Sequence, residues 1–578
     1  MIAIKKSLAI LMSVCLLVGC IAMTAVVQAA TTGSITIQNP SHSTATVAGK
    51  TFNVYKVFNA TTDASNSNTS YSWYVDSNGD VPFHDFFYGV GRPLGEYTGT
   101  GFGPVQAAVN KLAEYESHSL ELSQLAEDMH KYILDNGIDP VCPSVTAGDT
   151  ATSVTISDLD FGYYLVYDDT TLSGGEETSA VRSAVMLTTV DKDWTITLKA
   201  NRPQVLKQVR ENNGSFGKGT SVSVGDTVTF KISTAVPSRN HYSTYHYAVE
   251  DTMHDGLSLQ QGSIKVYYDG TLLTRDADYT LDFPTTGTVD FKVDFTPSMK
   301  RKVGTEDYFA VNKTLSIEYD AEVTDDIEAQ KANQNTAKLI YSNDPVDEDS
   351  RGTVSDSANV YSYQFVFTKF AQDSNGTFRN TRLAGAEFKL YREGEDDPIL
   401  FTTTSKTVTV DGQDHTFTQY VVAQDDATVT TDTLVSDSQG EPSINLSHLN
   451  FGGHMGDVSI FGLAEGTYKL VETKAPDGYI TPTEPFMVVI EDEIGSDGSV
   501  GRLSVTGSHT GGATDAKIMN TLGIAESILT VWADITNQPG ATLPETGGMG
   551  TALFTVLGVV LMAGAVAFFT SRKRSSAA

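Results

Sequence analysis

The sequence has 578 residues and carries 39 Lys and Arg against 71 Asp and Glu, which gives a formal net charge of −32 at neutral pH. This acidic balance argues against nucleic acid or an anionic surface as a partner. Of the three cysteines, only Cys142 lies beyond the first 20 residues. An exported chain with one cysteine has no internal disulfide, so any cross-link within it must use another chemistry.

The N-terminal residues have the pattern of a secretory signal peptide. Two lysines precede an apolar run from Leu8 to Val27, and small residues follow as far as Ala29. We therefore predict a signal peptide over residues 1–29 and a secreted chain. The alternative is a lipid anchor on Cys20, because Leu17–Cys20 resembles a lipoprotein box. The apolar run continues beyond that cysteine, which favours cleavage after Ala29.

The chain between the signal peptide and the C-terminal segment is long enough for three domains of roughly 150 residues each. Polar segments that end in proline, which are typical of domain boundaries, occur at Asn201–Pro203 and at Ser342–Pro345. We predict domains over residues 30–200, 201–360 and 361–541.

Alternating Val, Thr, Tyr and Phe residues bounded by Gly, Asn and Asp recur along all three predicted domains. Such runs are typical of strands in a β-sandwich. Examples are Ser221–Ile232, Ser263–Tyr268, Thr314–Glu322 and Phe486–Ile490. The sequence therefore predicts a mainly β protein built from tandem immunoglobulin-like sandwiches.

Helical periodicity is found in the first predicted domain. Apolar residues repeat at helical spacing from Leu122 to Ile133, and Asn136-Gly137 supplies a stop signal. A second, weaker helix is expected over Val105–Tyr115. We expect the first domain to be a strand-rich fold with a helical insertion.

The C-terminal segment, residues 542–578, combines three features in order. The pentapeptide Leu543, Pro544, Glu545, Thr546 and Gly547 is followed by residues 549–570, which carry no charged side chain, and by a basic tail at residues 571–578. The apolar stretch is long enough as a helix to cross roughly 30 Å of hydrocarbon, and the basic tail would stay cytoplasmic.

The pentapeptide resembles the LPxTG sorting signal of Gram-positive surface proteins. This resemblance implies that a sortase cleaves after Thr546 and holds the chain as an acyl-enzyme. It also implies transfer to a lysine of another subunit or to cell-wall peptidoglycan.

Residues Tyr468–Tyr479 resemble the E-box of the Cna B-type domains found in collagen-binding adhesins and Gram-positive pilins. Phe365–Lys369 and Ala533–Asn537 stand where that family has its first and last strands. The resemblance implies an intramolecular isopeptide bond between Lys369 and Asn537, assisted by Glu472. Asn520 is the alternative acceptor.

The residues around Lys369 fit this chemistry. The lysine lies between aromatic and β-branched residues, where desolvation would lower its pKa toward the neutral amine. The same dry setting would raise the pKa of Glu472, so that the acid can carry a proton and polarise the amide. Contact between the amine and the carboxamide then supplies the high effective concentration that the reaction needs.

The second predicted domain carries a looser version of this pattern. Pro203–Val209, Val224–Phe230, Tyr247–Met253 and Asn335–Pro345 together resemble the isopeptide-forming middle domain of Gram-positive backbone pilins. The resemblance implies the triad Lys207, Asp251 and Asn335, with Asn343 as the alternative acceptor. Strand alternation alone leaves open whether Asp251 or the adjacent Glu250 faces inward. If the first and last strands of this domain are parallel neighbours, the beginnings of the two strands lie side by side. This arrangement would favour Asn335.

Backbone pilins present the lysine used for polymerisation in a WxxxVxVYPKN motif before the second domain. Trp194–Asn201 is a degraded match, in which the tryptophan is too close to the lysine and the Tyr-Pro pair is missing. By position the resemblance implies Lys199 as the site of intermolecular linkage. Lys192 and Lys56 are weaker candidates.

These features predict the shaft subunit of a sortase-assembled fimbrium at the cell surface. The expected partners are a pilin-specific and a housekeeping sortase, other copies of this chain, tip or basal pilins and peptidoglycan. The alternative is a monomeric wall-anchored adhesin that binds host matrix or glycan. We expect no turnover enzyme, no metal and no cofactor, because isopeptide formation would be a single autocatalytic event.

Overall fold

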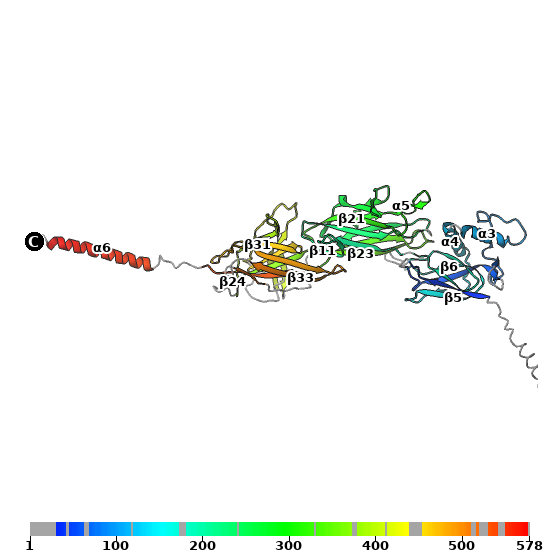
Figure 1. Cartoon of the computed structure of the whole chain (residues 1–578), viewed down its shortest axis with the longest axis horizontal. Coiled ribbons are helices and arrows are strands. Elements are labelled where there is room, and N and C mark those ends of the chain that lie inside the picture. Colours follow the sequence, from blue (N-terminus) through cyan, green and yellow to red (C-terminus); the bar gives the residue numbers. More distant parts are fainter. Residues whose placement is uncertain are drawn as a thin grey trace, which may run out of the picture.

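The computed structural model consists of three strand-rich units in a row, followed by the separate helix α6 (Met549–Ser575) at the C-terminal end (Figure 1). It describes residues 31–41, 45–62, 69–116, 119–172, 181–200, 202–239, 242–328, 331–372, 378–410, 413–438, 454–509, 516–519, 530–540 and 549–575. All strands of a unit come from one continuous stretch of the chain. These stretches are residues 32–197 in the first unit, 205–361 in the middle unit and 363–537 in the third unit. The expectation of tandem β-sandwich domains is confirmed.

The first unit packs a three-stranded sheet, ordered β5-β1-β8, and a five-stranded sheet that contains β3-β2-β6-β7, with β4 paired to β2. The strands are β1 (Thr32–Gln38), β2 (Thr51–Thr62), β3 (Thr69–Trp73), β4 (Val145–Thr146), β5 (Ser153–Asp160), β6 (Gly162–Asp168), β7 (Met186–Val190) and β8 (Trp194–Thr197). The helices are α2 (His84–Phe87), α3 (Val105–Glu116) and α4 (Ser119–Asn136).

Both expected helices are present between β3 and β4. Helix α4 buries the apolar stripe that its sequence predicts, including Leu125, Met129 and Ile133. It ends before Gly137, whose φ of +62° is a conformation that favours glycine. The helices pack on the five-stranded sheet through a separate aromatic and aliphatic core.

The middle unit is a sandwich of two large sheets. One contains β10-β9-β12-β21-β15-β16, with β14 paired to β21, and the other is ordered β11-β23-β22-β13-β18-β17. The elements are β9 (Val205–Arg210), β10 (Phe216–Gly217), β11 (Gly219–Ser221), β12 (Thr227–Ala235), β13 (Tyr247–Met253), β14 (Leu257–Leu259), η1 (Gln261–Ser263), β15 (Lys265–Tyr268), β16 (Thr271–Leu272), β17 (Thr280–Asp282), β18 (Phe291–Asp294), α5 (Thr296–Met299), β19 (Lys302–Val303), β20 (Glu306–Asp307), β21 (Thr314–Val323), β22 (Asn333–Ser342) and β23 (Arg351–Tyr361).

One expected strand of the middle unit is divided. The run Ser221–Ile232 does not form a single strand, because β11 ends at Ser221 and β12 begins at Thr227. Between them, the N–H of Asp226 donates to the carbonyl of Ser223, and Gly225 has a φ of +85°. This turn moves the chain from one sheet to the other. Because the alternation of apolar residues continues on both sides of the turn, the sequence pattern does not show the break.

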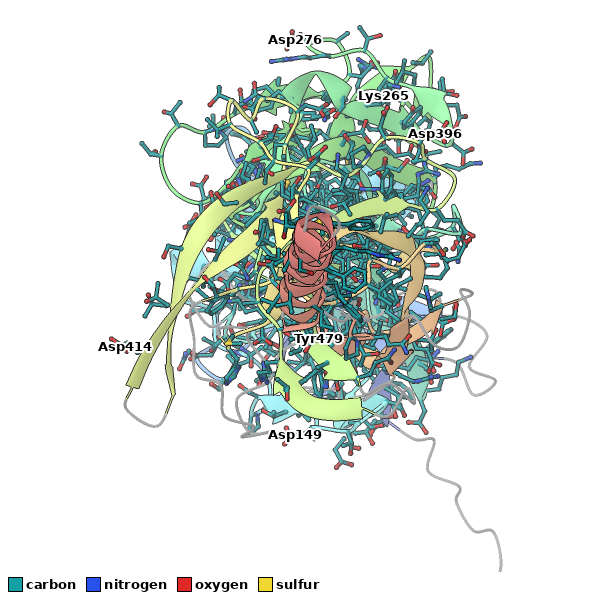
Figure 2. The ribbon with its side chains drawn as sticks, turned by 90° about the vertical axis from the view of Figure 1, so that its left-hand side faces the viewer. Asp149, Lys265, Asp276, Asp396, Asp414 and Tyr479 are labelled. Carbon is teal, nitrogen blue, oxygen red and sulfur yellow. The ribbon has the colours of Figure 1, made fainter. Side chains whose placement is uncertain are left out.

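The third unit is also a sandwich. One sheet contains β27-β28-β30-β24-β35-β34, with β25 paired to β24, and the other is ordered β29-β26-β31-β32-β33. The strands are β24 (Tyr363–Gln372), β25 (Phe378–Arg382), β26 (Glu387–Arg392), β27 (Phe401–Val410), β28 (Gln413–Val422), β29 (Leu434–Val435), β30 (Asp457–Leu463), β31 (Gly466–Lys474), β32 (Phe486–Ile494), β33 (Val500–His509), β34 (Ala516–Met519) and β35 (Thr530–Asn537). Figure 2 shows the β27–β28 hairpin projecting sideways, with Asp414 near its tip.

The middle and third units are connected by a very short link, because β23 ends at Tyr361 and β24 begins at Tyr363. The turn between β32 and β33 lies against the middle unit, and the carbonyl of Gly498 accepts hydrogen bonds from Asn359 Nδ2 (3.0 Å) and Tyr361 Oη (2.8 Å). This direct contact fixes the direction in which one sandwich follows the other.

Candidate isopeptide sites and wall anchor

The third unit places Lys369 and Asn537 on neighbouring parallel strands. Strand β24 pairs with β35 so that Lys369 lies opposite Ile535 and Ala371 lies opposite Asn537. Glu472 is on β31 of the opposite sheet and faces them across the core. Strand alternation thus brings three polar side chains into the interior of an otherwise apolar sandwich.

The three groups contact one another directly. Lys369 Nζ donates to Glu472 Oε2 at 2.8 Å and to Asn537 Oδ1, while Asn537 Nδ2 donates to Glu472 Oε1 at 2.7 Å. Lys369 and Asn537 have no exposed surface, and Glu472 is 4% exposed. The amine therefore lies against the carboxamide it would attack, and the acid contacts both.

Burial shifts both titrating groups toward their neutral forms. Desolvation lowers the pKa of Lys369 to about 8, although Glu472 opposes the shift. Desolvation likewise raises the pKa of Glu472, against the effects of Lys369 and Asn537. The lysine also lies over the rings of Phe388 and Phe486, at 5.3 and 5.7 Å from their centroids. A neutral amine beside a protonated acid is the pair that amide aminolysis requires.

The middle unit assembles a second group of the same kind. Lys207 on β9 contacts Asp251 Oδ2 on β13, and both side chains are fully buried. Desolvation lowers the pKa of Lys207 to about 8 and raises the pKa of Asp251. Glu250 instead lies near Lys292, 3.5 Å away, so Asp251 is the acid that faces inward.

Asn335 joins this group through Asp251, whose pKa it lowers by hydrogen bonding, and through Tyr319, a residue that the sequence reasoning missed. Its Nδ2 donates to the phenol oxygen of Tyr319 at 2.8 Å, and that phenol contacts Lys207 Nζ and donates to Asp251 Oδ1 at 2.7 Å. The alternation of β21 could have shown that Tyr319 faces inward, because Leu315 and Ile317 do so too. The sequence holds no signal for the contact itself.

The alternative acceptor in the middle unit lies elsewhere. Asn343 follows the other end of β22, where its carbonyl accepts from the N–H of Arg182 and its Oδ1 accepts from Ser350. The expected pairing of first and last strands is wrong in this unit. Strand β9 pairs with β10 and β12, whereas β22 belongs to the opposite sheet, so Lys207 and Asn335 approach each other across the sandwich.

Lys199 follows β8 and is exposed. Its backbone is held by the Ser183 hydroxyl and the Ala184 N–H, while partial desolvation by its surroundings lowers the pKa of its amine. Lys192 is also exposed but lies over the Trp194 ring, and Lys56 is buried at 6% exposure. Lys199 thus combines an exposed position with an amine whose pKa is lowered by desolvation.

Several predicted features lie outside the described residues. They are the signal peptide, Asn520 and the pentapeptide at residues 543–547. Helix α6 includes an apolar stretch, Phe554–Arg572, that is long enough to cross a membrane. Cys142 is a free, half-buried thiol whose pKa is raised by burial. Within the described ranges, no cluster of His, Cys, Asp and Glu could hold a metal ion.

Two family models match the chain. A model of the prealbumin-like fold domain SpaA matches residues 372–500, and a model of the LPXTG cell wall anchor motif matches residues 535–576. The chain therefore contains a prealbumin-like domain and carries a cell wall anchor, which assigns it to the cell-wall surface.

Individual proteins show more distant similarity. The Trypsin-resistant surface T6 protein of Streptococcus pyogenes serotype M6 is 22% identical over 405 residues, which is 65% of this chain and 70% of the relative. Similar solved structures include the T6 backbone pilin of S. pyogenes (16% identity, TM-score 0.47, 89% of this chain and 99% of that chain) and the Corynebacterium diphtheriae major pilin SpaA (14% identity, TM-score 0.40, 88% and 99%).

Proposed function

We propose that this protein is the shaft subunit of a covalently polymerised, sortase-assembled pilus at the cell wall. The observation that carries the proposal is that two buried Lys–acid–Asn groups occur in successive sandwiches of a chain with a wall anchor. Such groups suit a structural subunit, because cross-links within each sandwich resist mechanical load and proteases without disulfides.

The internal cross-links form by aminolysis of asparagine. The neutral amine of Lys369 attacks Cγ of Asn537, the Nζ–Cγ bond forms, and the Cγ–Nδ2 bond breaks. Glu472 takes a proton from the amine and gives one to Nδ2, which leaves as ammonia. Lys207 and Asn335 form the corresponding bond in the middle unit, with Asp251 as the acid. Each reaction occurs once, so the protein is matured by the chemistry and does not turn over.

The subunits join through the sorting signal. Sortase acylates itself with Thr546, and the amine of Lys199 from another copy resolves the acyl-enzyme. The exposure of Lys199, the lowered pKa of its amine and its position between two sandwiches support this assignment. For the last subunit of the chain, peptidoglycan replaces the lysine as acceptor.

Intact mass of the purified ectodomain tests the internal bonds. We expect a mass lower than the sequence sum by two ammonia molecules. Glu472→Gln should lose the third-unit bond alone, and Asp251→Asn the middle-unit bond alone, with peptide mapping to identify each. An ectodomain whose mass equals that of its unmodified residues would overturn this part of the proposal.

Polymerisation is tested in cells that carry the cognate sortases. Surface extracts boiled in SDS should give a ladder of high molecular weight, and Lys199→Arg should reduce it to the monomer. Lys192→Arg is the matched control, because Lys192 is an exposed lysine of the same unit. A ladder that survives Lys199→Arg contradicts the Lys199 assignment. Single copies from the wild-type cells would instead indicate a tethered monomeric adhesin.

A further inference from the structure

We propose that Tyr319 is a catalytic residue of the bond-forming reaction in the middle unit, where its phenol relays a proton from Asp251 to the departing nitrogen of Asn335. This inference rests on the Lys207–Asn335 bond of the proposed function. It adds a fourth group to that reaction, and the third unit reacts without one.

The phenol oxygen of Tyr319 contacts every member of the group. It donates to Asp251 Oδ1 at 2.7 Å, accepts from Asn335 Nδ2 at 2.8 Å and accepts from Lys207 Nζ. The side chain is 1% exposed, so no bulk water competes for these contacts. These three contacts place the phenol oxygen between the acid and the amide, and the hydroxyl hydrogen can rotate from one partner to the other.

The third unit shows what the phenol replaces. There, Glu472 contacts the carboxamide nitrogen of Asn537 directly, at 2.7 Å, as well as the lysine. The acid of the middle unit is an aspartate, which is shorter by one methylene. Asn335 also lowers the pKa of Asp251 by hydrogen bonding, while its Nδ2 hydrogen-bonds the Tyr319 hydroxyl at 2.8 Å. That hydroxyl in turn hydrogen-bonds Asp251 at 2.7 Å, so the phenol links the acid to the amide nitrogen.

The proton transfers balance through this path. From the neutral pair, the amine of Lys207 attacks Cγ of Asn335 and the Nζ–Cγ bond forms. Once Asp251 carries a proton and Cγ has become tetrahedral, the hydroxyl turns so that it accepts from the acid and donates to Nδ2. Asp251 then gives its proton to the phenol oxygen while the phenol gives its own proton to Nδ2, and the Cγ–Nδ2 bond breaks to release ammonia. Asp251 then takes one proton from the former amine, so both Asp251 and Tyr319 end as they began.

The surroundings keep the phenol in the form that a relay needs. Burial raises the pKa of Tyr319 well above its ordinary value, with a further contribution from Asp251, so the hydroxyl stays protonated. Phe230 stacks on the ring with centroids 5.6 Å apart, and Phe291 meets it edge-on at 4.9 Å. These contacts hold the ring in place even when its hydroxyl is removed.

The test is Tyr319→Phe in the full ectodomain, purified rapidly after a short induction and followed by intact mass and peptide mapping. We expect the Lys207–Asn335 bond to be missing at isolation and to form ~100-fold more slowly or worse, the lower end of the usual contribution of general acid catalysis. The Lys369–Asn537 bond of the same molecule should be complete, and it serves as the internal control.

Tyr247→Phe is the matched control variant. Tyr247 is equally buried in the middle unit, but its hydroxyl bonds Thr234 and the carbonyl of Ala235, away from the reacting groups. It should be isolated with both bonds complete. A Tyr319→Phe protein that also carries the complete middle-unit bond at the earliest time point would overturn the relay.

A second variant separates loss of the relay from a general disturbance of the site by Tyr319→Phe. Combining it with Asp251→Glu gives the middle unit the longer acid of the third unit, which should reach the amide directly and restore the bond. A double variant that stays unlinked contradicts the inference. If instead the wild-type middle unit itself lacks the bond by mass, the proposed cross-link fails, and this outcome is distinct from a failure of the relay alone.

Discussion

At the scale of single residues, each site gains its reactivity from an unfavourable burial. Lys207 and Lys369 are enclosed together with their acids, and a buried ion pair is often no more stable than apolar residues of the same volume. Desolvation therefore favours the neutral pair, which is the reactive one. Formation of the amide removes both the titrating amine and the penalty of burying it.

A pH dependence follows for a protein in which the third-unit bond cannot form. In Asn537→Ala, Lys369 has a pKa of about 8 when folded, against about 10.4 in an unfolded chain. Between these values the unfolded state binds the extra proton, so the free energy of unfolding should rise with pH, by up to roughly 3 kcal/mol. The raised pKa of Glu472 gives the opposite slope just above the acid's ordinary pKa, because there the folded state binds the proton.

Urea unfolding across this pH range, followed by the fluorescence of Trp532, measures the effect. Trp532 lies on β35 in the third unit, and Trp73 and Trp194 would be replaced by Phe to isolate its signal. The linked parent, in which Lys369 is an amide, should show no rise between pH 8 and 10.4. Parallel curves for the two proteins would contradict the assignment.

At the scale of elements, the motifs that resemble the Cna B-type and pilin domains predicted most of both sites, and strand alternation agrees with them in the third unit. The alternation of β31 and β35 places Glu472 and Asn537 on inward faces, and the register of the parallel pair β24–β35 brings Lys369 beside Asn537, although β24 itself is buried along its whole length. The stripe of α4 and the Asn-Gly stop were equally readable. For the helix, the information lies in the local period of the sequence, whereas for the sites it lies in the motifs.

Other features depend on which strands share a sheet, and the alternation of side chains along one strand does not contain this information. Lys207 and Asn335 come from opposite sheets, on β9 and β22, and are connected in the core through Tyr319. The turn at Gly225 divides a run whose alternation continues on both sides of it. Tyr319 was readable as a core residue, but its role depends on a hydroxyl meeting three side chains from three other strands.

At the scale of the whole molecule, the units follow one another through contacts that resist bending. Arg182 of the first unit forms an ion pair with Asp344 at 2.6 Å. Between the middle and third units, the backbone N–H groups of Ala464 and Glu465 donate to the hydroxyls of Ser223 and Ser221. A pilus shaft transmits tension along this row of units, which Figure 1 shows end to end.

Gly498 is the position at which the middle–third junction is most easily tested. Its φ is +80°, and a Cβ added there would lie 2.4 Å from the carbonyl oxygen of Lys218 in the middle unit. Gly498→Ala must therefore both strain its own turn and push the two sandwiches apart. We expect a wider distribution of interdomain angles in small-angle X-ray scattering and faster proteolysis near Ser362, with both internal bonds intact by mass.

Gly270→Ala is the matched control, because Gly270 has nearly the same φ, +82°, but nothing within 4 Å of the added Cβ. The two variants pay the same backbone strain, on the order of 1–3 kcal/mol, so any difference between them comes from the junction. Scattering that is identical for both variants and the wild type would show that this turn does not hold the two units in line.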